Sequence, residues 1–205
     1  MVNPSSTPTS ARPRDFALGV IVAAILIILA GMVIPFLRSR EMARDEKRAR
    51  DDLIDVREAI RAFVRDVGLP PTRDKDGNDR ALLRLCGPGR PPEGAYFVND
   101  AYEGNYVDHL FRNEPFGKVN SPGYAHWNGP YLKRLEYDPW YRAYFVVAYP
   151  LNARDGFGDG RVCIVVCAGP NGRMDGDYSS PRSAIAAGDD LVEVVTLDGP
   201  ESDGK

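Results

Sequence analysis

The sequence has few of the residues that build metal centres and catalytic sites. It contains three cysteines and two histidines in 205 residues, and none of them forms a Cys-x-x-Cys or His-Glu-x-x-His motif, so the common zinc motifs are excluded. No Gly-x-Ser-x-Gly elbow and no Gly-rich phosphate loop occurs. Basic residues are not in excess, because 26 Lys and Arg stand against 29 Asp and Glu, and this balance gives no electrostatic footprint for nucleic acid. The sequence therefore supports neither a known enzyme class nor a nucleic-acid-binding protein.

The odd number of cysteines rules out a fold held together entirely by disulfides. Cys163 and Cys167 lie in a segment that reads as a β-strand. Their side chains would share a face of the strand at a separation of roughly 13 Å, which is too far for a bridge. We expect buried, unpaired cysteines; a bridge from either of the two to Cys86 is the alternative.

Charged side chains are absent from residues 16–37. A bilayer core needs about 20 consecutive apolar residues in a helix, and this segment has that length. A signal peptide has a shorter apolar region of about 7–15 residues, followed by small residues and a cleavage site, whereas this segment leads directly into Arg38. We therefore predict a single transmembrane helix over 16–37, preceded by a disordered, leader-like segment over 1–15 that is rich in Pro, Ser and Thr.

The helical pattern continues beyond the apolar segment. Apolar residues recur at helical spacing at Leu53, Val56, Ile60, Phe63, Val64 and Val67. Gly68 and the prolines that follow it end the pattern. Residues 38–67 are thus predicted to be a soluble continuation of the helix, so that 16–67 forms one element. The alternative is two helices joined by a hinge near 38–44.

The remaining sequence predicts a globular domain over 68–197 and a flexible tail over 198–205. Its first part, 69–130, is rich in proline and glycine and should be mostly loop. Within that part only Asp79–Leu85 is predicted as a short helix, and this segment precedes the β-rich region.

Three strands are predicted in the second part of the globular domain, over 143–149, 161–168 and 191–196. Because no helical segment separates them, they should form an antiparallel meander. The predicted fold class is α+β: a long N-terminal transmembrane-plus-soluble helix packed on a loop-rich segment and a three-stranded antiparallel sheet.

Four aromatic residues gather near the proline-rich segment that leads into the first strand: Trp127, Tyr131, Trp140 and Tyr141. We expect them to form a packed cover on the long helix. A cleft that binds a ligand between aromatic side chains is the alternative.

Several segments, taken in order, resemble the major pseudopilin of type II secretion systems and, more widely, the type IV pilins: Gly129–Lys133 with Asp138–Trp140, Ala168–Gly172, and Gly188–Leu191. The resemblance covers residues 16–196. It implies a pseudopilin-like fold and a structural, non-enzymatic subunit. Such a subunit assembles with like subunits and other secretion-system components into a pilus-like fibre, and no small-molecule substrate is expected. It also implies a single-pass protein of the bacterial inner membrane with its globular domain outside the cytoplasm.

The same resemblance implies a calcium site formed by the loops around the second and third strands. Calcium takes 6–8 oxygen ligands, including carboxylates and backbone carbonyls. By resemblance, Asp189 and Asp190 would be carboxylate ligands and the carbonyl group of Ala168 or a neighbour would supply a backbone oxygen. Asn171 stands where the family often has Asp, so one negative charge is missing.

The loop between these motifs is longer than usual in the family and brings two further acids, Asp175 and Asp177, which could replace the missing charge. The alternative is that the acids of these loops only form turns.

The N-terminal segment departs from the family pattern, which has a glycine before the cleavage site and a glutamate four residues after the first mature phenylalanine. Phe16 and Leu18 fit this pattern, but Asp15 replaces the glycine and Val20 replaces the glutamate. These departures favour an alternative in which the chain is a membrane-anchored extracytoplasmic binding module that does not assemble. A second alternative, an anchored extracytoplasmic enzyme, has no motif to support it.

The distribution of basic residues conflicts with the orientation that the resemblance implies. Arg12 and Arg14 precede the apolar segment, whereas a larger group follows it: Arg38, Arg40, Arg44, Lys47, Arg48 and Arg50. The positive-inside rule would keep this second group in the cytoplasm. The resemblance instead places it outside, and we retain that orientation as the expectation.

Overall fold

The computed structural model describes residues 13–68, 82–94, 106–114, 123–148, 161–178 and 186–196. The chain divides into two compact units, Met1–Arg44 and Asp45–Lys205. The predicted flexible tail, 198–205, lies outside the described residues.

Helix α1 is formed by Pro13–Val67. Proline is favoured in the first turn of a helix because it has no N–H group, and an N–H group at this position would have no partner within the helix. Gly68 ends the helix with a positive φ of 84° and donates its N–H to the carbonyl of Val64 at 2.8 Å, a common way to close a C-terminus. The predicted end at residue 67 is confirmed, but the helix begins at Pro13, within the segment 1–15 that was predicted to be disordered. The backbone is also helical through 38–44, where the alternative placed a hinge.

The first unit contains the apolar part of α1. Its large apolar side chains are exposed; Ile27 is 71% and Met32 is 68% exposed. Within the described part of the chain, α1 is the one helix that is long and apolar enough to cross a membrane.

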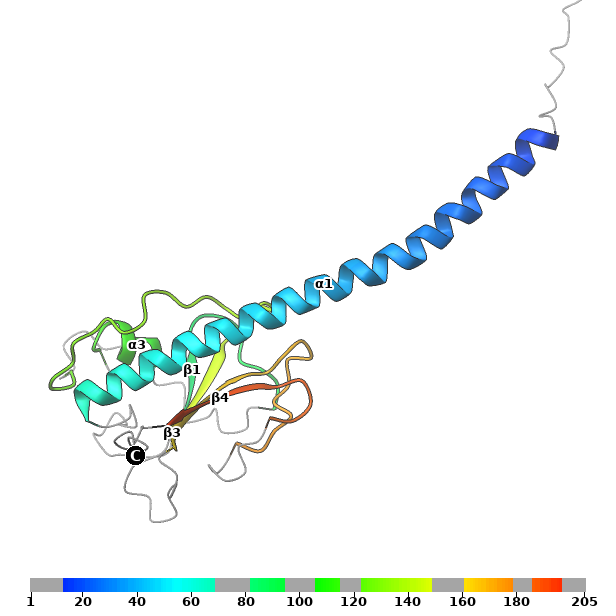
Figure 1. Cartoon of the computed structure of the whole chain (residues 1–205). Coiled ribbons are helices and arrows are strands. Elements are labelled where there is room, and N and C mark those ends of the chain that lie inside the picture. The colour runs from blue at the N-terminus through cyan, green and yellow to red at the C-terminus, as the bar shows by residue number, and fades with distance from the viewer. Residues whose placement is uncertain are drawn as a thin grey trace, which may run out of the picture. The chain divides into compact units, whose positions relative to one another are not determined.

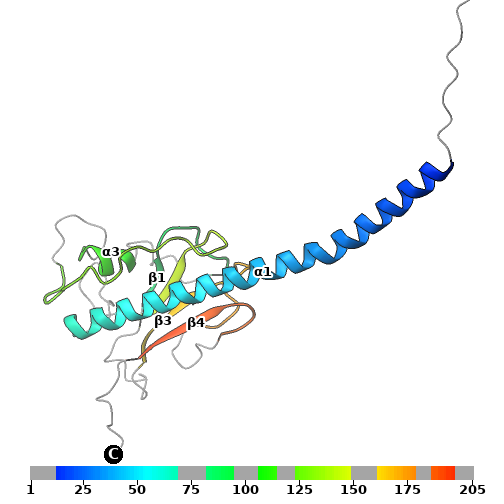
Figure 2. The same cartoon turned by 45° about the horizontal axis from the view of Figure 1, so that its top comes forward.

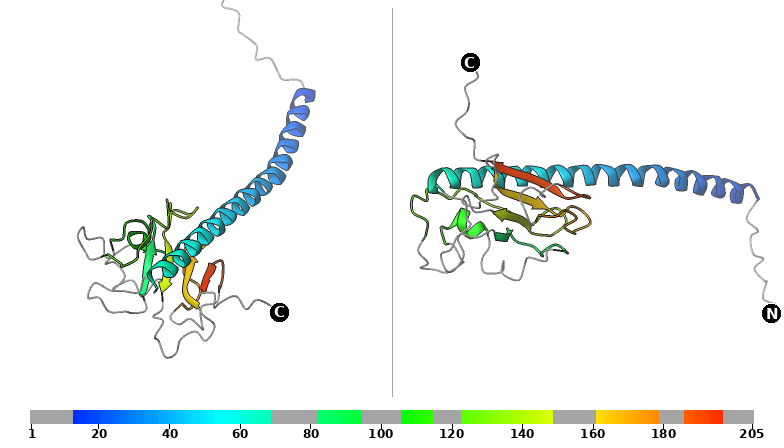
Figure 3. Two further views of the ribbon diagram at one scale, coloured as in Figure 1. Left: turned by 60° about the vertical axis from the view of Figure 1, so that its left-hand side comes forward. Right: turned by 90° about the horizontal axis from the view of Figure 1, so that it is seen from below.

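The second unit is built on a four-stranded antiparallel sheet with the order β1-β2-β3-β4. Figure 3 shows the strands in this order. The strands are β1 (Leu82–Cys86), β2 (Tyr144–Ala148), β3 (Arg161–Cys167) and β4 (Leu191–Thr196). The last three form the predicted meander, and β1 extends it by one strand that the sequence did not predict.

The predicted helix over Asp79–Leu85 is wrong for the residues that the structure describes, because residues 82–85 belong to β1. A short apolar run fits a helix or a strand by its pattern alone. Pairing with β2, from Leu82 opposite Ala148 to Cys86 opposite Tyr144, satisfies the backbone of β1 in the sheet. A short helix that was not predicted, α3 (Tyr106–Phe111), also belongs to this unit.

One face of the sheet packs against the part of α1 that belongs to the second unit (Figures 1 and 2). Alternate residues of β2 and β3 point toward the helix, including Tyr144, Val146 and Val165. The helix contributes a buried stripe at helical spacing, which consists of Ala49, Leu53, Val56, Ile60, Phe63 and Val64. Burying each large apolar side chain contributes about 1.5–3 kcal/mol, so this stripe is a main source of stability for the unit.

Polar contacts fix the position of the helix on the sheet. The Tyr144 hydroxyl donates to Asp52 at 2.7 Å, and Arg57 pairs with Glu193 of β4 at 2.7 Å. Farther along the helix, the Tyr131 hydroxyl donates to Asp66 at 3.0 Å. These three contacts link α1 to two strands and to the segment before β2, so they set its register as well as its position.

The predictions for cysteines and aromatic residues are largely met. Cys86, Cys163 and Cys167 are buried and form no disulfide with one another, as expected. Of the aromatic residues listed earlier, Trp127, Tyr131 and Trp140 pack against the helix–sheet core. The fourth, Tyr141, is 68% exposed and is therefore not part of this cover.

Candidate metal site at one end of the sheet

Two loops meet at one end of the sheet, the loop that follows β3 and the turn that precedes β4. They meet because β3 and β4 are antiparallel, which places the end of one strand beside the start of the other. Gly169 and Gly188 have positive φ angles of 58° and 59°. A Cβ atom at Gly169 would overlap the backbone of Asp189, and one at Gly188 would overlap the carboxylate of Asp175. Glycine is thus required on both sides for the loops to approach this closely.

Asp190 is the most buried acid of this loop cluster, with 5% of its surface exposed. Its Oδ2 accepts hydrogen bonds from the N–H groups of Asp175 and Gly176, both at 2.9 Å, and from the Tyr178 hydroxyl at 2.6 Å. Three donors on one carboxylate oxygen fix the orientation of the carboxylate, because the side chain cannot rotate without losing them.

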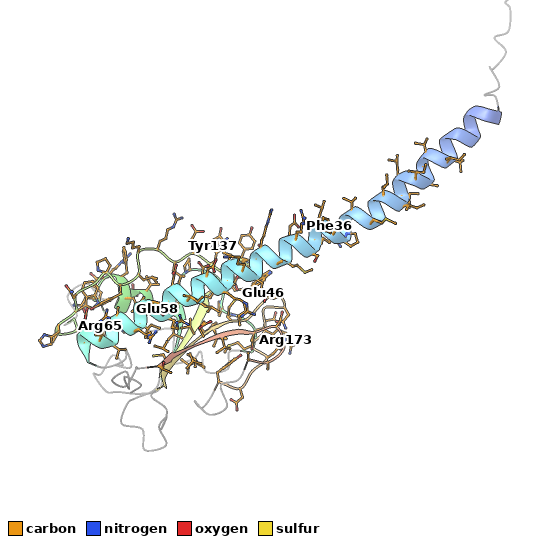
Figure 4. The ribbon with its side chains drawn as sticks, viewed as in Figure 1. Phe36, Glu46, Glu58, Arg65, Tyr137 and Arg173 are labelled. Carbon is orange, nitrogen blue, oxygen red and sulfur yellow. The ribbon has the colours of Figure 1, made fainter. Side chains whose placement is uncertain are left out.

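Asp189 and Asn171 connect the two loops. Asp189 Oδ2 accepts a hydrogen bond from the N–H of Asn171 at 2.9 Å. The side chain of Asn171 donates to Asp175 Oδ2 at 2.8 Å and accepts from the N–H of Arg173 at 2.6 Å; Figure 4 labels Arg173 in this loop. Of the two additional acids predicted from the loop length, Asp175 joins the site by accepting the hydrogen bond from Asn171. Both Asp175 and Asp177 are exposed.

Two carboxylate oxygens in the cluster are buried and accept no hydrogen bond from the described residues: Oδ1 of Asp189 and Oδ1 of Asp190. These two residues are adjacent in the sequence and are the two carboxylate ligands that the sequence predicted. An unsatisfied buried acceptor of this kind costs about 1–3 kcal/mol, and more when it is charged. A cation bound to both oxygens would remove this cost.

Burial raises the pKa of Asp190 above its ordinary value of 3.8. The hydrogen bonds from Tyr178, Gly176 and Asp175 oppose this effect, and the nearby charge of Asp175 adds to it. Without a bound cation, the surroundings of Asp190 therefore destabilise its ionised form. A divalent cation would stabilise that form.

The donor set suits an oxygen-binding cation and requires more than carboxylates. Within the described ranges, no group of three or more His, Cys, Asp or Glu side chains has an arrangement that could hold a metal ion by itself. A complete shell would need the amide oxygen of Asn171 and backbone carbonyls. The carbonyl of Ala168 accepts from the N–H of Gly172 at 3.2 Å and has a second lone pair to offer.

The structure brings together the loops that carry the four residues predicted as metal ligands: Ala168, Asn171, Asp189 and Asp190. Tyr178, which fixes Asp190, was not predicted. Tyr178 stands in a loop whose spacing follows no motif, so no local signal could have found it. Its role depends on the fold, because its ring packs with Phe145 and Ile164 on the sheet face opposite α1.

Comparisons with known proteins give no relative from which a function could be transferred. No family model matches the chain, and no curated protein and no solved structure matches it significantly.

Proposed function

We propose that this chain is a single-pass membrane protein that serves as a pseudopilin-like structural subunit. In this proposal the apolar part of α1 anchors the subunit in the bacterial inner membrane, and the globular unit lies outside the cytoplasm. Like subunits and other components of a type II-like secretion system would join it in a pilus-like fibre. No catalytic role and no small-molecule substrate are assigned to it.

The observation that carries the proposal is the difference in burial between the two parts of α1. Its first part exposes apolar side chains such as Ile27, and its last part buries a stripe against an antiparallel sheet. Exposed apolar surface of this extent needs lipid or other apolar helices around it. A subunit built this way can be stored in a membrane and can later pack its apolar segment against the same segment of its neighbours.

Calcium has a structural role in the proposal. Asp189 and Asp190 would bind Ca²⁺ through the oxygens that have no other partner, with Asn171 and the carbonyl of Ala168 completing the shell. The ion would neutralise adjacent acids and join the loop after β3 to the turn before β4. It would therefore stabilise the globular unit without taking part in any reaction.

A test of the calcium site compares Asp189→Asn and Asp190→Asn with Asp55→Asn, an exposed acid on α1 outside the site. Asn keeps a hydrogen-bond acceptor and removes the charge. Calcium at about 100 times its Kd should stabilise the unmodified protein by about 2.7 kcal/mol. Both site variants should lose most of this gain, and Asp55→Asn should keep it. Equal gains in all four proteins would contradict the site.

A second candidate function keeps the membrane anchor and the globular fold but omits assembly. The observation that favours it is the N-terminal sequence, where Asp15 and Val20 replace the glycine and glutamate of the family pattern. The chain would then be a permanently anchored binding module outside the cytoplasm.

The mass of the protein purified from its native membrane separates the two candidates. A new N-terminus at Phe16, with or without a methyl group, would show that the leader is removed and would support the fibre subunit. A mass that includes residues 1–15 would favour the anchored module. Loss of secretion on deletion of the gene would argue against the module and for the fibre subunit.

A further inference from the structure

Two tyrosines with exposed rings lie side by side on the second unit. Tyr137 is 40% and Tyr141 is 68% exposed, and their ring centroids are 5.0 Å apart. Two arginines flank them, and both contact the carboxylate of Glu136. The side chain of Arg134 is 80% exposed and that of Arg48 is 45% exposed. We call these four residues, Arg48, Arg134, Tyr137 and Tyr141, the Tyr-Arg patch.

The turn that carries the patch is held rigidly. Asp138 is fully buried, and its Oδ1 accepts from the N–H groups of Trp140 at 2.9 Å and Arg142 at 2.7 Å. Tyr141 has a φ of 68°, a conformation that is unfavourable for a bulky residue. Such a conformation persists when the surrounding contacts enforce it. The fold therefore presents an aromatic ring to the outside at a conformational cost, although an exposed loop could have carried a small polar residue here.

The patch lies at the end of the second unit where the chain arrives from the apolar segment. Arg48, near the start of this unit, donates to the carbonyl of Tyr137 at 3.4 Å. Figure 4 shows Tyr137 beside α1 near the level of Glu46, far from Arg65 at the other end of the docked helix. Only residues 38–44 separate the apolar segment from this unit, a length that spans at most about 25 Å.

The chemistry of the patch matches the surface of a bilayer. Tyrosine is enriched at the level of the headgroups because its ring is apolar and its hydroxyl is polar. Arginine binds phosphate through paired N–H donors, and each basic residue near an anionic membrane surface adds about 1 kcal/mol of attraction. Glu136 offsets one of the two positive charges of the patch. In the preceding stretch, Arg38, Arg40 and Arg44 are exposed and outnumber the one acid among them, Glu41, so the net charge stays positive.

We propose that the Tyr-Arg patch docks the globular unit on the headgroups of anionic phospholipids beside its own anchor. This inference rests on the proposed membrane anchor and adds a second point of attachment. Docking would hold the globular unit against the membrane until the subunit leaves the bilayer.

The test uses the full chain reconstituted in vesicles of phosphatidylcholine and phosphatidylglycerol whose acyl chains are brominated near the headgroup. Tyr141→Trp keeps an aromatic ring in the patch and places a fluorophore there; Arg65→Trp places the same fluorophore at the opposite end of the docked helix. Trp127 and Trp140 give a background that the unmodified protein measures. We expect bromine to quench the added fluorescence of Tyr141→Trp and to leave that of Arg65→Trp unchanged.

Charge and ring variants then test the patch itself in the Tyr141→Trp background. Arg134→Gln should lower the ratio of docked to undocked protein about fivefold, and Tyr137→Ser should lower it further. Vesicles of phosphatidylcholine alone should weaken docking at least as much as Arg134→Gln, because they remove the anionic partner of every arginine. Quenching that is equal at positions 141 and 65, or that ignores both variants, would overturn the proposal.

Carbonate extraction of the same vesicles separates this inference from the anchor on which it rests. A chain that carbonate removes has no anchor, and the proposed function fails with the inference. A chain that stays in the vesicles while the fluorophore of Tyr141→Trp remains unquenched overturns the docking alone. The fluorophore of Tyr141→Trp could also become less accessible to bromine as the number of chains per vesicle rises. That result would show that the patch contacts a second copy of the chain, and it would also overturn lipid docking.

Discussion

The two parts of α1 share one helical backbone but differ in what surrounds their apolar side chains. In the first unit, apolar side chains cover the helix and are exposed, as Ile27 and Met32 show. In the second unit, a single stripe that includes Leu53 and Phe63 is fully buried, and charged residues occupy the outer face. The second part obtains its apolar environment from the sheet of its own chain. The first part has no such environment among the described residues.

This difference is visible in the spacing of the apolar residues along the helix. A stripe about 100° wide indicates one apolar partner surface. A helix that is apolar all round indicates surroundings that are apolar on every side. Substitutions at matched positions of the two parts of α1, or of its buried and outer faces, should therefore have different effects.

The largest expected effect comes from the buried stripe. Phe63 has no exposed surface and packs edge-on against Tyr124 at 4.9 Å between centroids. Phe63→Ala should lower the free energy of unfolding of the globular unit by about 3–5 kcal/mol. Urea unfolding of the full chain in detergent, followed by tryptophan fluorescence, measures this loss. Ile27→Ala is the control and should leave the unfolding curve unchanged; a similar loss there would erase the distinction between the two parts.

A charge in the first part should act on membrane insertion and leave the globular unit intact. Ile27→Lys places a lysine in the apolar segment and should disfavour insertion by about 3 kcal/mol. The fraction that resists carbonate extraction measures this change. Ile54→Lys, on the outer face of the docked part where Ile54 is 37% exposed, should stay fully inserted. Equal extraction of both variants would contradict the assignment of the anchor.

A smaller effect is expected from the ion pair that joins α1 to β4. Arg57 and Glu193 are about one-quarter exposed, and their charged atoms are 2.7 Å apart. Arg57→Gln should lower the unfolding free energy by about 0.5–1 kcal/mol. Lys47→Gln breaks an ion pair with Asp51 that lies entirely on the outer face of the helix and should change less. If the two variants unfold alike, the contact with β4 does not strengthen docking.

The smallest expected effect is a pH dependence from Asp52. Burial raises the pKa of Asp52, and the hydrogen bond from Tyr144 and the charge of Arg48 oppose the shift. A raised pKa in the folded state favours the protonated form. Its contribution to stability is therefore complete below the ordinary value of 3.8 and is lost as the pH rises through the raised value.

Asp52→Asn should flatten this part of the stability–pH curve, and Asp51→Asn, which removes only the smaller contribution of a neighbouring charge to the same shift, should flatten it less. Denaturant titrations between about pH 4 and about pH 7 measure the slope. A curve that keeps its slope in Asp52→Asn would assign the pH dependence to other buried acids, such as Asp138 and Asp190, whose pKa values burial also raises.

Much of the fold follows from local patterns in the sequence. The helix end at Val67 is marked by Gly68, and the three strands β2, β3 and β4 stand out as β-branched and aromatic runs between turns. β1 could not be predicted because its pattern is short and ambiguous, and only pairing with β2 decides it. Such pairing is a tertiary effect that overrides local preference.

The acids of the candidate site could be predicted from the sequence, but the geometry of the site could not. The adjacent acids Asp189 and Asp190 could be identified from the motif that contains them. In Asp190, Tyr178 and the backbone N–H of Asp175 donate to Oδ2 and leave Oδ1 without a hydrogen bond from the described residues. The spacing of residues in the sequence does not encode this arrangement. The exposure of Tyr141 was likewise not predictable, because the buried Asp138 that fixes its turn looks like an ordinary turn residue.

The shared core of α1 and β4 also fixes the order of events during synthesis. Arg57 and its partner Glu193 are 136 positions apart, and Leu53 and Val195 belong to one core. A ribosome therefore releases the buried stripe of the helix long before the strand that covers it. If the apolar segment enters the bilayer as it emerges, the rest of the chain folds while tethered to a surface. The globular unit then completes its folding only after β4 has been synthesised.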